Sequence, residues 1–327
     1  MRDASILSHV AGSATSTGAR PTGASLGSRL PAPGWRTRFA PAPTGYLHLG
    51  HLVNAIHVWG IARAFGGRVL LRLEDHDRSR CRPEYEQALL DDLDWFGFVP
   101  DEAPTSAFRA GPTPHRQSDN TAAYERALDA LSQRGVVYPC VCSRRDILQV
   151  TGPVPAGVEA RYPGTCRVAP ASPSLTHARR VALPERIVHF DDLRLGAQTQ
   201  HPSRECGDVL VRDRDGNWTY QFAVVVDDRD QGIDVVIRGE DLLASTGRQL
   251  LLAELLGRAS PPRFLHHPLL VHTDGRKLSK AAADTGLRAL RAAGASAASL
   301  IGLAAHRAGL LEAPRPLSAG DVATLFA

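Results

Sequence analysis

The chain has 327 residues, of which 43% are hydrophobic and 22% are charged, and it carries a net charge of +4. This length favours about two domains of ~150 residues, and the ordinary composition excludes wholesale disorder. No apolar run reaches the ~18 residues of a membrane span, so no membrane partner is expected, and five cysteines argue against a secreted disulfide framework.

Residues 1–34 are rich in Ala, Ser, Thr, Gly and Pro and show no lasting apolar period. We therefore predict a disordered leader over this segment. As its origin we favour a start codon assigned too far upstream over a targeting peptide.

An alternation of strands and helices is predicted to begin near Trp35. The predicted elements are a strand at 36–40, a helix at 49–65, a strand at 68–73 and an amphipathic helix at 83–96. Such a succession is a βαβ unit. It predicts an α/β fold with a Rossmann-like, doubly wound parallel sheet.

Residues 104–205 interrupt this alternation with a helix at 124–134, three cysteines and many prolines. We predict that they form an inserted subdomain within a catalytic domain at 35–257. A final segment, 258–327, is predicted to carry a lysine-containing loop and C-terminal helices. After the insertion, the predicted elements are strands at 208–212, 220–226 and 233–237, a helix at 246–256, and a last strand at 269–272.

The loop between the first strand and the first helix contains Pro41, Gly45, His48, Gly50 and His51. This is the ligand-binding edge of an open α/β sheet, and a helix N-terminus there favours phosphate. The glycines allow the backbone to approach a ligand closely. The two imidazoles could donate hydrogen bonds to charge that develops on a transferring group. Helix-capping or surface histidines are the alternative.

Only two of the 38 basic residues are lysines, Lys277 and Lys280, and they flank Ser279 in one short segment. Since Arg replaces Lys everywhere else, this pair indicates a position that needs the compact ammonium group. A loop of this kind can close over a polyphosphate and neutralise leaving pyrophosphate. An ordinary exposed charged loop is the alternative.

These two motifs together resemble the signatures of class I aminoacyl-tRNA synthetases. His48-Leu-Gly-His51 corresponds to the HIGH motif, and Lys277-Leu-Ser-Lys-Ala corresponds to the KMSKS motif. The segments similar to the glutamyl branch are Arg38-Phe-Ala-Pro-Ala-Pro-Thr-Gly, Leu73-Glu-Asp, the stretch 219–228 and the stretch 236–241. His76, after Glu74-Asp75, and Ala281 depart from the pattern. The resemblance covers about 36–285 and implies an AMP-forming ligase that activates glutamate with ATP and Mg²⁺.

Lys280 is followed by 47 residues, 281–327, which is short for a domain of ~50–200 residues. No anticodon-binding domain is therefore expected, and the chain resembles the glutamyl-Q tRNA(Asp) synthetases. That resemblance implies a cytoplasmic enzyme, expected to be a monomer, that transfers glutamate to the queuosine base in the anticodon loop of tRNA(Asp). The alternatives are a truncated glutamyl-tRNA synthetase that charges a tRNA 3′ end and a non-catalytic, zinc-containing RNA-binding paralogue.

The resemblance also implies the roles of individual residues. The glutamate pocket it implies consists of Arg38, Ala40, Ala42, Glu74, Tyr220 and Arg238. The ATP contacts it implies are Pro41, Gly45, His48, Gly50, His51, Lys277, Ser279 and Lys280, of which the two histidines and two lysines would be catalytic. Two arginines can each hold a carboxylate bidentately, and glutamine would leave one of them poorly paired. Which arginine holds which carboxylate stays open.

A zinc site is implied by Cys140-Val-Cys142 and Tyr162-Pro-Gly-Thr-Cys166, which are similar to the metal site of this family. Three thiolates and one phenolate supply the four ligands that zinc prefers. A structural zinc ion would stabilise a subdomain that is too irregular to hold a core alone. Reduced, buried cysteines beside a core tyrosine are the alternative. Cys81 and Cys206 lack such spacing and are expected to be ordinary thiols.

Overall fold

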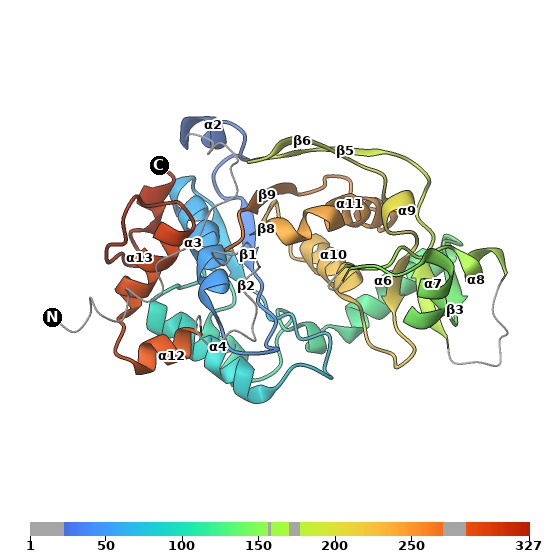
Figure 1. The fold of residues 1–327 in the computed structure, drawn as a ribbon, viewed down its shortest axis with the longest axis horizontal. Coiled ribbons are helices and arrows are strands. Elements are labelled where there is room, and N and C mark those ends of the chain that lie inside the picture. Colours follow the sequence, from blue (N-terminus) through green and yellow to red (C-terminus); the bar gives the residue numbers. More distant parts are fainter. Residues whose placement is uncertain (1–22, 156–157, 170–176, 271–285) are drawn as a thin grey trace.

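The computed structural model describes residues 23–155, 158–169, 177–270 and 286–327, and its ribbon is drawn in Figure 1. The predicted α/β class is confirmed, because parallel strands alternate with helices around a buried core. Within the described ranges, none of the helices combines the length and the apolar character that crossing a bilayer requires.

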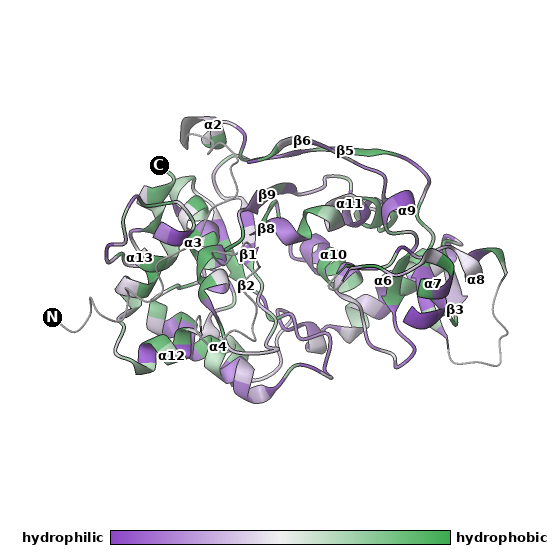
Figure 2. Ribbon diagram, in the orientation of Figure 1, coloured by the Kyte–Doolittle hydropathy of each residue, from purple (hydrophilic) through white to green (hydrophobic). Residues whose placement is uncertain are grey.

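The first βαβ unit forms as predicted. Strand β1 (Arg36–Phe39) pairs in parallel with β2 (Arg68–Leu71), and helix α3 (Leu49–Ala64) connects them. The left-handed Gly66, with φ of 69°, turns the chain from the helix toward β2. Buried side chains surround α3, which packs between the sheet and the C-terminal helices. Figure 2 shows its largely hydrophobic ribbon.

A second run of strands continues beside β1. Strand β8 (Val235–Gly239) pairs in parallel with β9 (Arg263–His267). On its other side, β9 pairs in parallel with β5 (Val188–Asp192), which forms an antiparallel hairpin with β6 (Gly196–Gln200). The backbone N–H of Asp234 donates to the Arg36 carbonyl at 2.9 Å, which joins the start of β8 to β1. The carboxyl ends of β1, β2, β8 and β9 therefore share one edge.

The predicted strand at 220–226 is wrong, and the described half of the one predicted at 269–272 does not form a strand. Residues 220–226 belong to helix α10 (Tyr220–Asp230), which is buried in a second hydrophobic cluster. A short, continuously apolar run carries no period that separates a buried helix from a buried strand. The last described strand is β9, whereas Leu269 and Leu270 lie beyond it and 271–272 fall outside the described residues.

The right-hand end of the molecule in Figure 1 holds a separate three-stranded sheet. Its antiparallel order is β3-β4-β7, so the predicted strand at 208–212 forms but does not resume the main sheet. Conversely, the β5–β6 hairpin lies within 104–205 yet joins the main sheet through β9. The structure thus departs from the predicted insertion boundaries at both places. The elements of this end are β3 (Val137–Cys140), β4 (Ala178–Val181), β7 (Val209–Arg212), α6 (Thr121–Gln133), α7 (Arg144–Thr151), α8 (Thr165–Val168) and α9 (Pro202–Glu205).

The remaining helices include those at the C-terminus. The C-terminal elements form as predicted and pack beside α3, where a Cβ at Gly60 would lie 2.3 Å from the Phe326 ring. The bounds are α4 (Pro83–Phe96), α5 (Thr105–Ala110), η2 (Gln117–Asp119), η3 (Glu240–Ser245), α11 (Thr246–Leu255), α12 (Leu287–Ala292), α13 (Ala297–Arg307) and η5 (Val322–Leu325).

The predicted disordered leader is wrong for residues 23–34. Helix α2 (Gly23–Gly27) forms there, and Leu26 and Leu30 are buried in the main core. The Arg29 guanidinium donates to the Asp191 carboxylate and to the Leu193 carbonyl at 2.9 Å. Two leucines in a segment otherwise rich in small and polar residues leave no helical period in the sequence, so only the tertiary contacts reveal the packing.

Candidate functional site

The loop after β1 places His48 at the start of α3. Its Nδ1 accepts a hydrogen bond from the Gly50 backbone N–H at 3.0 Å, and Nδ1 of His51 accepts one from the His48 backbone N–H at 3.2 Å. A Cβ on Gly50 would lie 2.9 Å from the His48 ring. Glycine at position 50 therefore leaves room for the capping imidazole.

This capping geometry also fixes the two imidazoles. Because each Nδ1 accepts a backbone N–H, each neutral ring carries its proton on Nε2 and can donate from there. The two ring centroids lie 4.0 Å apart at the positive end of the α3 dipole. The predicted alternative of helix-capping histidines describes the geometry correctly, because Nδ1 is the capping atom of each ring. A helix N-terminus of this kind is suited to an anion.

Lys277, Ser279 and Lys280 lie outside the described residues. The chain re-enters the described structure at Gly286, which forms an antiparallel bridge with His48, and the Leu287 N–H donates to the Leu47 carbonyl at 3.2 Å. The described residue that precedes the gap, Leu270, is buried in the main core. The segment that follows the predicted lysine loop is thus attached directly to the histidine loop.

A buried network of charged side chains joins β1, the segment that follows β2, and helix α10. Arg38 Nε donates to Asp228 Oδ1 at 3.2 Å, and Arg72 donates to the same oxygen at 2.7 Å. Arg72 also donates to Glu74 Oε1 at 3.0 Å. Asp228 therefore binds two arginines, and Arg72 connects it to the predicted ammonium-binding carboxylate.

The members of this network keep one another charged. Burial alone would lower the pKa of Arg72, but the carboxylates of Asp228, Glu74 and Asp227 raise it above its ordinary value. Burial alone would raise the pKa of Asp228, but Arg38 and Arg72 hold it below its ordinary value. Such mutual compensation is what allows ionised groups to remain inside a protein.

Arg238 has a different environment from the other two buried arginines. Its guanidinium donates to His266 Nε2 at 3.0 Å, Gln249 Oε1 at 2.7 Å and Thr246 Oγ1 at 2.9 Å, and each of these groups is neutral. His266 accepts at Nε2 because its Nδ1 donates to Asp192 at 2.7 Å. Burial lowers the pKa of both Arg238 and His266.

A buried cation held only by neutral groups is stabilised when an anion binds beside it. No carboxylate lies within ion-pair distance of Arg238 among the described residues, although the residue is 4% exposed. A buried guanidinium in such surroundings is suited to the carboxylate of a ligand.

The other residues that were predicted to bind the glutamate substrate lie near Arg238. Tyr220 lies at the start of α10. Burial raises the pKa of its hydroxyl, and the charges of Arg238, Glu74 and Arg38 also act on that hydroxyl. The loop after β1 is fixed to Glu74, whose N–H donates to the Pro41 carbonyl at 3.1 Å. The partly exposed residues of the loop after β1 include Ala40, Ala42 and Gly45.

The sequence analysis missed the residues that hold this pocket in place. Arg72 could have been found, because a single cation within an apolar strand, Val-Leu-Leu-Arg-Leu, needs buried carboxylate partners. Asp228 lies within the stretch 219–228, whose resemblance to the glutamyl branch implied no role for this residue. Gln249 and His266 come from α11 and β9, and no local pattern marks either of them.

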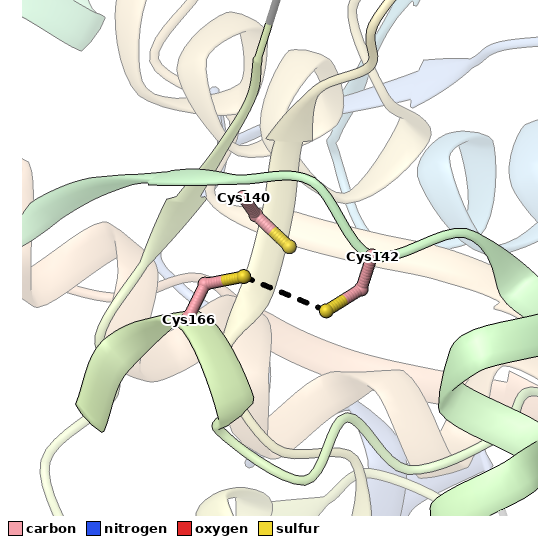
Figure 3. A group of neighbouring side chains, drawn as sticks. All are labelled: Cys140, Cys142 and Cys166. Atoms are coloured by element: carbon pink, nitrogen blue, oxygen red, sulfur yellow. Dashed lines mark hydrogen bonds between the residues drawn. The ribbon is translucent and has the colours of Figure 1, made fainter. Parts of the chain in front are cut away.

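The predicted metal ligands also come together, as Figure 3 shows for the three cysteines. Their Sγ atoms lie within 4.8 Å of one another, and Cys142 and Cys166 are separated by 3.5 Å, which is too long for a disulfide of about 2.05 Å. The Tyr162 hydroxyl lies 3.5 Å from Cys140 Sγ and 4.0 Å from Cys142 Sγ.

These separations fit a tetrahedral metal ion. Zinc–sulfur bonds of about 2.3 Å place two sulfur ligands about 3.8 Å apart. Burial and the neighbouring sulfur atoms raise the pKa of the Cys142 thiol to about 12, which favours its protonated form. A metal reverses this preference by binding the thiolates. Cys81 and Cys206 are half-buried free thiols outside the cluster, and burial raises the pKa of each to about 11.

Comparison with known proteins places this geometry in a family. Residues 35–301 match the family of tRNA synthetases class I (E and Q), catalytic domain. The glutamyl-Q tRNA(Asp) synthetase of Nitratidesulfovibrio vulgaris is 43% identical over 84% of this chain and 87% of its own length. The chain belongs to the glutamyl-Q tRNA(Asp) synthetase family. A second relative of that name, from Symbiobacterium thermophilum, is 40% identical over 88% of this chain and 91% of its own length.

Solved structures agree with this family assignment. The glutamate-tRNA synthetase of Elizabethkingia anophelis superimposes with a TM-score of 0.73 at 27% identity, covering 90% of this chain. The match covers 66% of that longer enzyme. This chain is therefore similar to part of that longer enzyme, and the predicted class I ligase fold is confirmed.

Proposed function

We propose that this protein activates L-glutamate with ATP and transfers the glutamyl group to the queuosine base of tRNA(Asp). The names of its relatives support this acceptor. The observation that carries the substrate assignment is the buried Arg238, whose described partners are all neutral. A dicarboxylate with one ammonium group complements two buried arginines and Glu74.

In the first step, an oxygen of the glutamate α-carboxylate attacks the α-phosphate of ATP, and pyrophosphate leaves. We propose that the Nε2–H groups of His48 and His51 donate to the phosphate oxygens as charge develops there. Lys277, Ser279 and Lys280 would hold the β- and γ-phosphates. Mg²⁺ bound with ATP neutralises part of the same charge. The protein supplies position and charge rather than a nucleophile.

The pocket would select glutamate by its charges. Among the described residues, Arg238 has no carboxylate within ion-pair distance, whereas Arg38 already shares Asp228 with Arg72. Either arginine can contact a substrate carboxylate, and Tyr220 can donate a further hydrogen bond. Glu74 would hold the ammonium group. Glutamine presents an amide in place of one carboxylate and would leave a buried guanidinium poorly paired.

We further propose that Cys140, Cys142, Cys166 and Tyr162 bind one structural zinc ion. The fit of the four donor atoms supports this site. A zinc ion there would link the end of β3 and the segment after it to α8, and it would take no part in the chemistry of the pocket. The enzyme is proposed to act as a cytoplasmic monomer, which sedimentation of the purified protein would test.

The decisive experiment mixes the protein with labelled glutamate, ATP, Mg²⁺ and tRNA(Asp), prepared with and without queuosine. We expect label only on the queuosine-containing tRNA. Label on the 3′ end of tRNA(Glu) would instead identify a truncated glutamyl-tRNA synthetase. Absence of glutamate-dependent ATP–pyrophosphate exchange would indicate a non-catalytic RNA-binding paralogue.

A matched pair of variants tests the pocket. Arg238→Met should lower kcat/KM for glutamate in ATP–pyrophosphate exchange by about 100-fold or more, because a buried charged hydrogen bond to substrate contributes about 3 kcal/mol. Arg204→Met removes an arginine whose side chain is 70% exposed, and it should leave exchange unchanged. Equal activity of the two variants would contradict the proposed role of Arg238.

A further inference from the structure

His76 departs from the family pattern and has no role in the steps described above. It lies in the segment that follows β2, two residues after Glu74, and its ring centroid is 6.3 Å from that of Tyr220. Both neighbours belong to the proposed glutamate pocket. A half-buried imidazole thus lies beside the site that would hold the glutamyl group.

A chain of hydrogen bonds fixes the orientation of this imidazole. Gln117 is 1% exposed, and its Nε2 donates to Asp227 Oδ2 at 2.7 Å. A carboxylate accepts here, so the amide nitrogen must face Asp227, and the amide oxygen faces the other way. That oxygen, Oε1, lies 2.6 Å from Nδ1 of His76.

The same chain fixes the tautomer. Because Gln117 Oε1 can only accept, Nδ1 of His76 carries a proton and donates it. In the neutral ring, Nε2 is then left as a proton acceptor. Within the part of the chain that the structure describes, Nε2 of His76 has no hydrogen-bond partner, and the ring is half-buried. It is therefore available to a ligand.

Asp227 is itself held from the far side of the network. The Tyr124 hydroxyl lies 3.0 Å from each of its oxygens, and Asn120 Nδ2 donates at 3.2 Å. The orientation of His76 is thus set by groups from η2, α6 and α10 that pack independently of any substrate. A base oriented by a second, anchored group is the arrangement that proton abstraction requires.

We propose that His76 is the base for the transfer step, which rests on the proposed function. The acceptor hydroxyl oxygen attacks the carbonyl carbon of glutamyl-adenylate and forms the new ester bond. The bond between that carbon and the phosphate oxygen breaks, and AMP leaves with the electron pair. The hydroxyl proton passes to Nε2 of His76 and then to solvent. Adenylate formation needs no such base, because a carboxylate is the nucleophile there.

The test measures the two half-reactions separately. His76→Ala should slow single-turnover transfer from preformed glutamyl-adenylate to queuosine-containing tRNA(Asp) by about 100-fold or more, the usual contribution of a general base. Its ATP–pyrophosphate exchange should fall by less than about 3-fold, because the base acts after activation. Added imidazole should restore transfer by the variant. His189→Gln, which changes an exposed histidine on β5, is the matched control and should match the wild type in both.

Each outcome separates the inference from the function. If the wild type transfers glutamate and His76→Ala transfers equally fast, His76 is not the base and the proposed function stands. If both half-reactions of the variant fall together, or if saturating imidazole restores nothing, His76 has a structural role and the inference is wrong. If the wild type activates glutamate but never acylates this tRNA, the proposed acceptor is wrong and the inference fails with it.

Discussion

The glutamate pocket and the cysteine cluster both bury polar atoms, but they stabilise them in opposite ways. In the pocket, Arg38 and Arg72 are neutralised by Asp228 and Glu74 of the same chain. In the cluster, the Sγ atoms of Cys140, Cys142 and Cys166 lie within 4.8 Å of one another beside the Tyr162 hydroxyl, and Arg180 Nε donates to Cys140 Sγ at 3.3 Å. The pocket is balanced by charges of its own chain, whereas we propose that a metal ion balances the cluster.

The two regions also differ in the core behind them. The pocket lies at the edge of the main core, to which β1, β2, α3 and the C-terminal helices all contribute. Among the described residues, the buried members of the cluster are Cys140, Ile147, Tyr162, Cys166 and Ala178. A core this small cannot offset the conformational entropy of its segments. We therefore expect the fold to hold the pocket and the proposed zinc ion to hold the cluster.

Metal removal should therefore produce the largest and most local effect. We expect about one zinc ion per chain, as structural four-ligand sites provide, and chelation should abolish hydrogen-exchange protection in β3 and α8 while α3 stays protected. Elemental analysis and exchange mass spectrometry measure both. Cys166→Ser should reproduce the loss, and Cys206→Ser, outside the cluster, should not. Full protection of the metal-free protein would contradict the contrast between the two regions.

Removal of the central cation should destabilise the pocket. Arg72→Met leaves Glu74 and Asp228 buried without their shared partner, and we expect the free energy of unfolding to fall by about 3–5 kcal/mol. Urea denaturation monitored by circular dichroism measures this change. The exposed Arg204–Glu185 pair, with both side chains 70% exposed, provides the control, since Arg204→Met should cost less than ~1 kcal/mol. Similar costs for the two variants would show that the network is not a unit.

The contrast also explains what the sequence could predict. Strand β1, helix α3, strand β2 and helix α4 follow from local periodicity and glycine stops, and the cysteine cluster follows from spacing that resembles a known metal site. These features depend on neighbours along the chain. Helix α10 was predicted as a strand because residues 222–226 form a short, continuously apolar run, and the packing of residues 23–34 depends on contacts with β5, far away in the sequence.

The same limit applies to the pocket. Arg38, Glu74, Tyr220 and Arg238 were named because their motifs resemble a family, not because the sequence placed them together. Their partners come from separate elements, such as Gln249 on α11 and His266 on β9. A pairing of this kind leaves no periodic trace, so the sequence can identify the charged residues of a site but not the groups that balance them.

A carboxylate outside both regions provides the finest test of this balance. Asp92 on α4 is 7% exposed, and its nearest cation is Arg291, at 3.8 Å. Burial raises the pKa of Asp92 to about 6, above its value in the unfolded chain. The folded state therefore binds this proton more tightly, and the contribution of Asp92 to stability falls as pH rises from about 4 to about 6. Asp228, whose pKa is lowered, has the opposite sign and loses its contribution as pH falls.

Asp92→Asn should consequently stabilise the protein at pH 8 by about 1–3 kcal/mol and have little effect near pH 4, where the wild-type carboxyl is already protonated. Urea denaturation at the two pH values measures the difference. Asp91→Asn, one residue away with a side chain that is 54% exposed, should change stability by less than ~1 kcal/mol at either pH. A gain at pH 4 as large as that at pH 8 would mean that packing, rather than an unbalanced charge, limits stability at this position. A gain confined to pH 8 would extend the rule of the pocket, because a buried carboxylate then stabilises the fold only where a buried cation faces it.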